Sequence, residues 1–132
     1  VSPGSLVIEI SEHDVLDHPD VVDAFLAPLR AIGCQFAISG FGRRSVSLTS
    51  LTAMRPDLVK VDGGIVRSLR LGQSSRKKLT AMVSIAKAVG FALVGEGVET
   101  DETLADLREA GVDYAQGFGI QVPAPISLII DH

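Results

Sequence analysis

The chain has 132 residues, of which 46% are hydrophobic, and this length and composition suit one buried core and one domain spanning residues 1–132. The formal net charge of -4 excludes the basic surface with which proteins bind nucleic-acid polymers. A small anionic ligand stays compatible with this charge.

The chain has one cysteine, Cys34, so an internal disulfide is excluded. The most apolar stretches, such as 91–94 and 126–130, are too short to cross a bilayer, and no cleavable signal is visible. We therefore expect a reducing, cytoplasmic environment and no membrane insertion by this segment. A longer parent protein could carry a membrane anchor.

Short apolar runs rich in Val, Ile and Phe predict five strands. They lie at 6–10, 35–39, 58–61, 91–95 and 112–115. Apolar positions at helical spacing predict helices between the strands, at 22–32, at 79–89 and at about 101–110, with a shorter helix at 45–54.

Residues that start and stop helices agree with these boundaries. Gly33, Gly90 and Gly111 each follow a last apolar position, where a left-handed residue ends a helix. Thr100, followed by acidic residues, is a good N-cap. Pro28 falls inside the first predicted helix and predicts an irregularity there, because proline lacks a backbone donor.

Strands that alternate with helices form a parallel sheet with right-handed crossovers. Two architectures fit this order: a doubly wound open sheet, or part of a (β/α)₈ barrel, whose full form needs roughly 250 residues. Length alone favours the open sheet.

Polar side chains gather at the carboxyl ends of the predicted strands, which meet at one rim of a parallel α/β fold. They are Glu9, Glu12, Lys60, Asp62, Glu96, Glu99 and Gln116. Asp62 and Glu99 are equally compatible with ordinary solvated loops. Glu9 and Lys60 lie inside apolar strands, where an unpaired charge would be costly. Carboxylates beside a lysine suit a divalent metal that acts on a phosphate ester.

Four segments resemble motifs of one family, the EAL-domain cyclic-di-GMP phosphodiesterases. Residues 8–12 resemble its E-[ILV]-T-E strand end, and 56–62 its P-D-x-[IL]-K-[IL]-D segment. Residues 95–100 are similar to its E-G-V-E-T motif, and 113–118 to its D-x-x-Q-G-[YF] motif. The resemblance runs from Leu6 to about Pro125 and implies the second half of a TIM-type (β/α)₈ barrel, with about five parallel strands alternating with helices.

The resemblance also implies roles for individual residues. Glu9 and Glu96 match metal ligands, Lys60 and Glu96 catalytic positions, Gln116 a substrate-binding position, and Glu12 and Glu99 glutamates that support loops. The ligand of the family is cyclic-di-GMP, and its cofactor is Mg²⁺ or Mn²⁺.

One departure from the family affects the metal site directly. Where the family has D-D-F-G, the chain reads Ser39-Gly40-Phe41-Gly42, so both ligand aspartates are replaced. Neither a serine hydroxyl nor a glycine supplies the anionic oxygen that Mg²⁺ or Mn²⁺ requires. We therefore expect weak or absent metal binding.

Other departures lie outside the motifs. The family loop T-G-Y-S-S-L is replaced at 43–48, and Val122 precedes Pro123 where the family has a basic residue. The first half of the family domain, including the E-A-L motif itself, has no counterpart in this sequence. A dinucleotide-binding reading of 40–45 with Asp62 is less favourable, because its third glycine is a serine and a full strand intervenes.

Three functions stay open. The favoured one is a degenerate EAL module without phosphodiesterase turnover, acting as a regulatory or interaction domain in cyclic-di-GMP signalling. The second is an active phosphodiesterase that yields linear pGpG once a missing first half completes it, and the third is a fragment with neither activity nor binding.

Five parallel strands leave two open sheet edges, so we expect a homodimer formed through these edges or through the loop at 43–48. The alternative is an open sheet whose edges are covered by the tail at 126–130.

Overall fold

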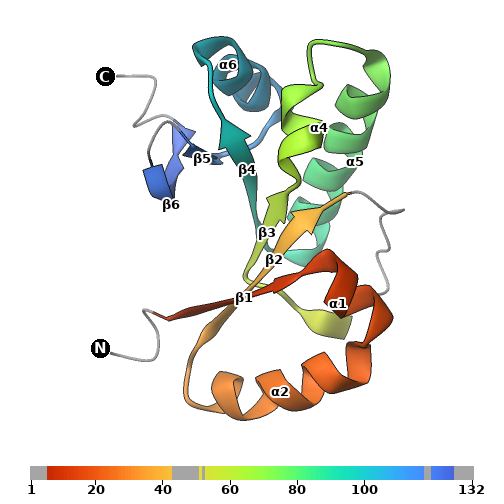
Figure 1. Ribbon diagram of the computed structural model, residues 1–132, viewed down its shortest axis with the longest axis vertical. Helices are drawn as coiled ribbons and strands as arrows, with labels where there is room; N and C mark the ends of the chain where they lie inside the picture. Colours follow the sequence, from red (N-terminus) through yellow and green to blue (C-terminus); the bar gives the residue numbers. More distant parts are fainter. Residues whose placement is uncertain (1–5, 43–50, 52, 118–119, 127–132) are drawn as a thin grey trace.

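The computed structural model describes residues 6–42, 51, 53–117 and 120–126, and for 120–124 it describes the backbone alone. Figure 1 shows the elements in chain order. They are β1 (Val7–Ser11), α1 (Glu12–Asp17), α2 (Pro19–Ala31), β2 (Gln35–Phe41), β3 (Leu58–Val61), α4 (Gly63–Arg67), α5 (Gln73–Val89), β4 (Ala92–Val98), α6 (Asp101–Ala110), β5 (Tyr114–Gly117) and β6 (Ile120–Pro125).

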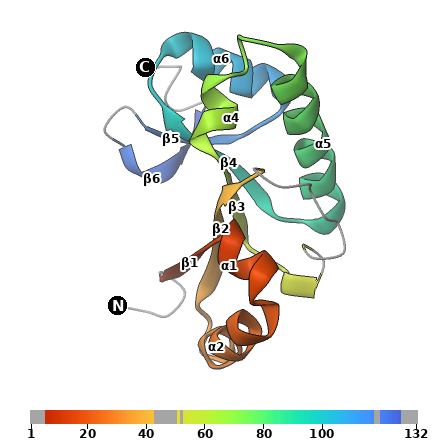
Figure 2. The same cartoon turned by 45° about the vertical axis from the view of Figure 1, so that its right-hand side comes forward.

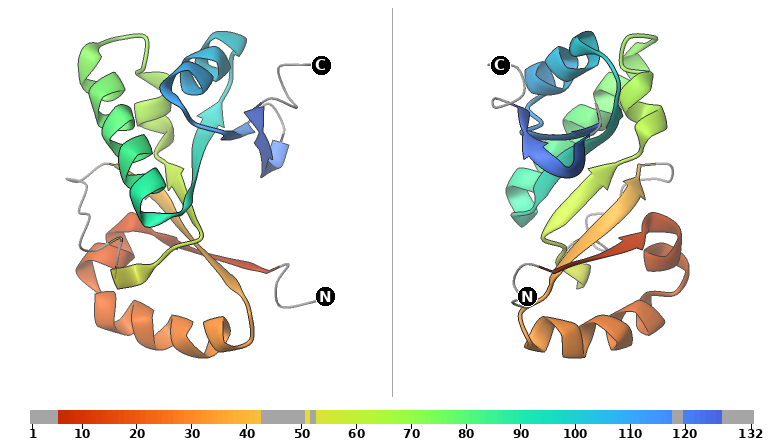
Figure 3. Two further views of the ribbon diagram at one scale, coloured as in Figure 1. Left: turned by 180° about the vertical axis from the view of Figure 1, so that it is seen from behind. Right: turned by 60° about the vertical axis from the view of Figure 1, so that its left-hand side comes forward.

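The strands form one six-stranded sheet in the order β1-β2-β3-β4-β5-β6. The first five pair in parallel, which confirms the predicted sheet, whereas β6 pairs antiparallel to β5. A doubly wound sheet reverses its strand order, and this sheet does not, so the order is that of a partial barrel. The sheet twists strongly, with α2 at one end of the molecule and α4, α5 and α6 at the other (Figures 1 and 3).

The core lies on both faces of the central strands. In β2, the consecutive residues Phe36, Ala37 and Ile38 are all buried, a pattern typical of a parallel strand covered on both sides. Leu26 from α2 and Leu79 from α5 are fully buried as well. Among the described residues, no helix is long and apolar enough to cross a membrane.

The predicted helix ends have the expected geometry. The Thr100 hydroxyl accepts a hydrogen bond from the Thr103 N–H at 3.1 Å, and Gly90 and Gly111 end α5 and α6 with φ of 98°. Contrary to the irregularity predicted at Pro28, α2 runs through this residue. Both Pro28 and Ala24, whose carbonyl loses its helical donor, are exposed, so water can supply the missing hydrogen bond.

Three elements were absent from the sequence prediction: α1, α4 and β6. Ser11 caps α1 and Asp62 caps α4, and both helices are too short for an apolar period to appear. The tail expected to cover the sheet edge is described as far as Ile126, which is buried, and 127–130 lie outside the described residues. Of the helix predicted at 45–54, only Leu51, Ala53 and Met54 are described, and all three are helical.

Candidate functional site

The register of the parallel strands brings the polar side chains to one face. Glu9 is aligned with Ala37, and Ala37 with Leu58. Lys60 is aligned with Val94, and Val94 with Tyr114. Because side chains alternate along a strand, this register puts Glu9, Ser39 and Lys60 on the same face. The pairing of β4 with β5 is irregular beyond Gly95, and Glu96 lies near Lys60 and Glu9.

Lys60 and Glu9 meet across β2. The Lys60 Nζ lies 3.1 Å from the Glu9 Oε2. The Lys60 side chain is 8% exposed and the Glu9 side chain is 44% exposed. The ammonium is therefore largely buried, whereas the carboxylate is in contact with water. Glu9 is therefore the partner of the buried Lys60 charge on β3. Because Glu9 is partly exposed to solvent, the ion pair contributes only modestly to stability.

Glu96, near the end of β4, lies among several charged side chains. Burial raises the pKa of its carboxyl above the ordinary value of 4.5, and the carboxylates of Glu9 and Asp62 raise it too. The Lys60 ammonium and a hydrogen bond from the Gly40 N–H act in the opposite direction. Three carboxylates thus share the neighbourhood of one ammonium.

Glu12 begins α1 and is buried at 4% exposure. Its Oε2 accepts a hydrogen bond of 2.6 Å from the Gly42 N–H, so the carboxylate holds the turn that follows β2. Glu99 follows β4 and is exposed, and Gln116 is half-buried in β5.

Ser39 and Gly40 lie near the carboxyl end of β2. Ser39 is aligned with Ser11 and is half-buried. Gly40 has a left-handed φ of 62°, which strains most side chains, and a Cβ built on it would lie 4.0 Å from the Asp62 Oδ1. At these two positions the site therefore presents one neutral hydroxyl and a bare backbone.

Two more side chains lie at this rim: Asp62, which the sequence placed there without a role, and Arg67. Asp62 caps α4 by accepting the Gly64 N–H at 3.0 Å, and it also acts on Glu96. Arg67 lies over two glycines: a Cβ on Gly63 would be 2.8 Å from its Nη1, and one on Gly97 3.1 Å. Nothing in the sequence indicated Arg67.

The residues of this site do not fit a divalent cation. Metal ions of this class take several anionic or carbonyl oxygens. Glu9 is held by Lys60, and Ser39 and Gly40 supply no carboxylate. Within residues 6–42, 51, 53–117 and 120–126, no three His, Cys, Asp or Glu side chains are arranged to hold a metal ion.

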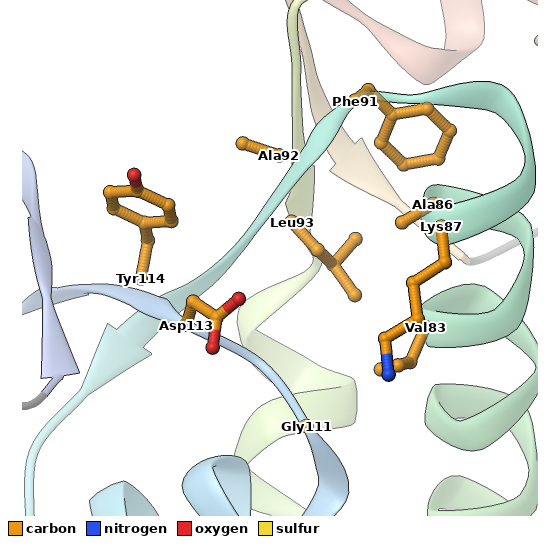
Figure 4. A pocket seen from close by; sticks show the side chains of 9 residues that line it. All are labelled: Val83, Ala86, Lys87, Phe91, Ala92, Leu93, Gly111, Asp113 and Tyr114. Atoms are coloured by element: carbon orange, nitrogen blue, oxygen red, sulfur yellow. The ribbon is translucent and has the colours of Figure 1, made fainter.

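A separate hollow of about 240 Å³ lies at the opposite end of the strands (Figure 4). It opens between α5 and the starts of β4 and β5, with Phe91 and Leu93 facing Val83, and Asp113 and Lys87 along its sides. Its lining is mostly apolar and contains none of the predicted site residues.

Comparison with known proteins identifies the family. A model of the EAL domain matches residues 1–123. The chain belongs to the EAL domain family.

Relatives and solved structures agree with this assignment. The EAL chain is 32% identical over 130 residues to the cyclic di-GMP phosphodiesterase RocR of Pseudomonas aeruginosa, a match that covers 98% of the chain and 33% of RocR. It also matches the calcium and cyclic-di-GMP complex of BlrP1 from Klebsiella pneumoniae with a TM-score of 0.84 and 31% identity, over 96% of the chain and 32% of BlrP1.

A third match is the cyclic-di-GMP complex of the PaMucR phosphodiesterase, with a TM-score of 0.83 and 26% identity, over 98% of the chain and 52% of PaMucR. The EAL chain thus spans about half or less of each of these proteins. Structures of the family contain Ca²⁺ or Mn²⁺ together with cyclic-di-GMP.

The raised pKa of Glu96 predicts how stability depends on pH. A carboxyl whose pKa is raised in the folded state binds its proton more tightly there, so the folded state loses stability as pH rises above 4.5. We expect Glu96→Gln to unfold at a higher temperature than the original chain at neutral pH, and the difference to vanish below 4.5. Thermal unfolding followed by circular dichroism measures this, with Glu109→Gln on the exposed side of α6 as the control. A Gln variant that is less stable at neutral pH would contradict the prediction.

Proposed function

We propose that this chain is the second half of a degenerate EAL domain that lacks phosphodiesterase turnover and serves as a regulatory or interaction module in cyclic-di-GMP signalling. The observation that carries the proposal is the rim of β2, where Ser39 and Gly40 replace two carboxylates. Hydrolysis with two metal ions needs ligands that hold both ions close together. With one neutral hydroxyl in their place, the site lacks the charge to assemble such a pair.

A second candidate is an active phosphodiesterase that yields pGpG when a first half completes the barrel. Its support is that Glu9 and Lys60 share one face and that Glu96 lies near both of them. Lys60 and Glu96 would then be the catalytic positions and Gln116 the substrate-binding one, while Glu12 would support the turn at Gly42. We favour the first candidate, because none of these residues compensates for the two missing aspartates.

Turnover distinguishes the two candidates. We expect no hydrolysis of cyclic-di-GMP in the presence of Mg²⁺ or Mn²⁺, because the metal pair cannot form. Chromatographic separation of cyclic-di-GMP from linear pGpG measures this directly, with RocR as the positive control. Steady product formation that Glu96→Ala abolishes would refute the degenerate assignment.

Restoring the carboxylates tests the cause of the loss. Gly40 has a left-handed φ of 62° that Asp and Asn tolerate better than other side chains, and space is open there. We expect Ser39→Asp with Gly40→Asp to bind Mn²⁺ about tenfold more tightly than Ser39→Asn with Gly40→Asn, which has nearly the same shape without the charge. Calorimetric titration with Mn²⁺ measures both. Equal affinities would mean that the missing charge is not the reason for weak binding.

We further propose that the chain forms a homodimer through α2 and the open edge of β1. Val21, Phe25 and Ile32 recur at helical spacing along α2 and its C-terminal end and are 69%, 56% and 59% exposed. Leu6 and Val7, at the start of the edge strand β1, are 46% and 42% exposed. Both elements lie at the same end of the molecule (Figure 2), so a second copy could cover them together.

The dimer predicts a specific response to charge. Phe25→Glu puts a charge in the middle of the apolar stripe and should give a monomer. Leu71→Glu changes a leucine that is 86% exposed between α4 and α5 and should leave the dimer intact. Light scattering on a size-exclusion column, repeated over an about tenfold dilution, measures the mass. A monomeric original chain at every concentration would rule out the dimer.

A further inference from the structure

The lysines and arginines are unevenly distributed along the chain. Six of the 12 lie between residues 63 and 95, a stretch that contains no aspartate or glutamate, and the other six share the rest of the chain with all 16 acidic residues. The six are Arg67, Arg70, Arg76, Lys77, Lys78 and Lys87. The net charge of -4 therefore conceals one strongly basic segment, whose cations lie on α4, on the turn after it and on α5.

Leu71, in the turn between α4 and α5, is 86% exposed, more than any other large apolar side chain of the described residues. Gly72, Gln73 and Ser74 beside it are exposed too, and a Cβ built on Gly72 would meet no atom within 4 Å. The turn lies at one end of the long axis of the molecule (Figure 1). Residues 67–78, the α4–α5 tip, therefore project from the fold and do not line a groove.

The α4–α5 tip is anchored from below, so that Leu71 is held outward. Leu69 is buried, and its carbonyl accepts a hydrogen bond of 2.8 Å from the Arg76 Nε. Asp106 of α6 pairs with two guanidiniums: the Arg70 Nε lies 3.1 Å from its Oδ2, and the Arg76 Nη2 lies 3.4 Å from its Oδ1. A turn that is already fixed loses little conformational freedom when it meets a partner, and this favours binding.

Asp106 balances only part of the positive charge at the α4–α5 tip. The side chains of Arg70 and Arg76 stay 55% and 42% exposed in spite of their pairing. Arg67 and Lys77 are exposed as well. The neighbouring α6 carries exposed acidic side chains, so the basic surface is confined to the tip and α5. One apolar side chain flanked by guanidinium and ammonium groups suits a layer of anionic headgroups over an apolar interior.

We propose that the α4–α5 tip adsorbs to an anionic lipid surface. Leu71 enters the headgroup region, and the flanking arginines and lysines contact phosphate and carboxylate groups of the lipids. A protein partner would need a pocket for the projecting leucine, whereas a bilayer receives it at any point of its surface. The contact is peripheral and involves no membrane-spanning segment. It uses neither the rim nor a metal ion, so its test is independent of the proposed loss of turnover.

Vesicle binding tests this surface with the chain as it is. Sedimentation measures the affinity for vesicles of phosphatidylcholine alone and for vesicles that also contain about 30% phosphatidylglycerol. We expect binding to the anionic vesicles only, weakened by salt. Leu71→Ser should weaken it about tenfold, because a leucine side chain no longer leaves water. Lys77→Gln with Lys78→Gln should weaken it by more than about tenfold, since each lysine contributes about fivefold.

Control variants make a matched change elsewhere or keep the apolar side chain. Lys87→Gln with Arg108→Gln removes two charges from exposed sites outside the α4–α5 tip and should bind anionic vesicles nearly as tightly as the original chain. Leu71→Phe should keep the affinity. Equal binding to both kinds of vesicle, no binding to either, or an equal loss in the two double variants would overturn the inference.

A tryptophan at the α4–α5 tip reports the contact directly, because the chain has no tryptophan of its own. The emission of Leu71→Trp should shift to the blue with anionic vesicles, whereas Val21→Trp, at a site 69% exposed on α2, should show no shift that depends on lipid. A shift at Val21→Trp alone would place the contact elsewhere and contradict the proposal. Binding to soluble poly-glutamate that is as tight as to anionic vesicles, and unchanged in Leu71→Ser, would mark an acidic protein as the partner and overturn the lipid contact.

Discussion

The pairing of a buried ammonium on β3 with a carboxylate on β1 is the constraint on which the site depends. Lys60 and Glu9 lie on strands that are not neighbours, and their contact at 3.1 Å crosses β2. This contact requires the observed register, in which Ala37 is aligned with both Glu9 and Leu58. A slip of one residue would turn either charge to the opposite face, where apolar side chains pack. The same register carries Ser39 to the shared face.

Around this pair, further side chains hold the segments that follow the strands. Glu12 still holds the turn after β2 through the Gly42 N–H, and Asp62 still caps α4. Burial raises the pKa of the Glu96 carboxyl and so do Glu9 and Asp62, whereas the Lys60 ammonium and the Gly40 N–H lower it. Glu96 thus lies near one ammonium and two other carboxylates.

Local patterns in the sequence were sufficient for the strands and the longer helices. Buried runs gave the five parallel strands, and Thr100, Gly90 and Gly111 fixed the helix ends through capping geometry. Length and periodicity could not decide between an open sheet and a partial barrel. The resemblance to a family decided between them. The helices α1 and α4 were missed because a helix of five or six residues is too short to show an apolar period. The strand β6 was missed because Pro123 and Pro125 argue against a strand.

The site was only partly predictable for a different reason. That Glu9 and Lys60 needed partners followed from their place in apolar strands, but that each is the other's partner depends on a register that no local pattern encodes. The most direct test of this account is the anomalous diffraction of crystals grown with Mn²⁺. It predicts no manganese peak within about 2.0–2.6 Å of the carboxylate oxygens of Glu9 or Glu96, with Lys60 still in contact with Glu9. A manganese ion bound to these carboxylates, with Lys60 displaced from Glu9, would contradict it.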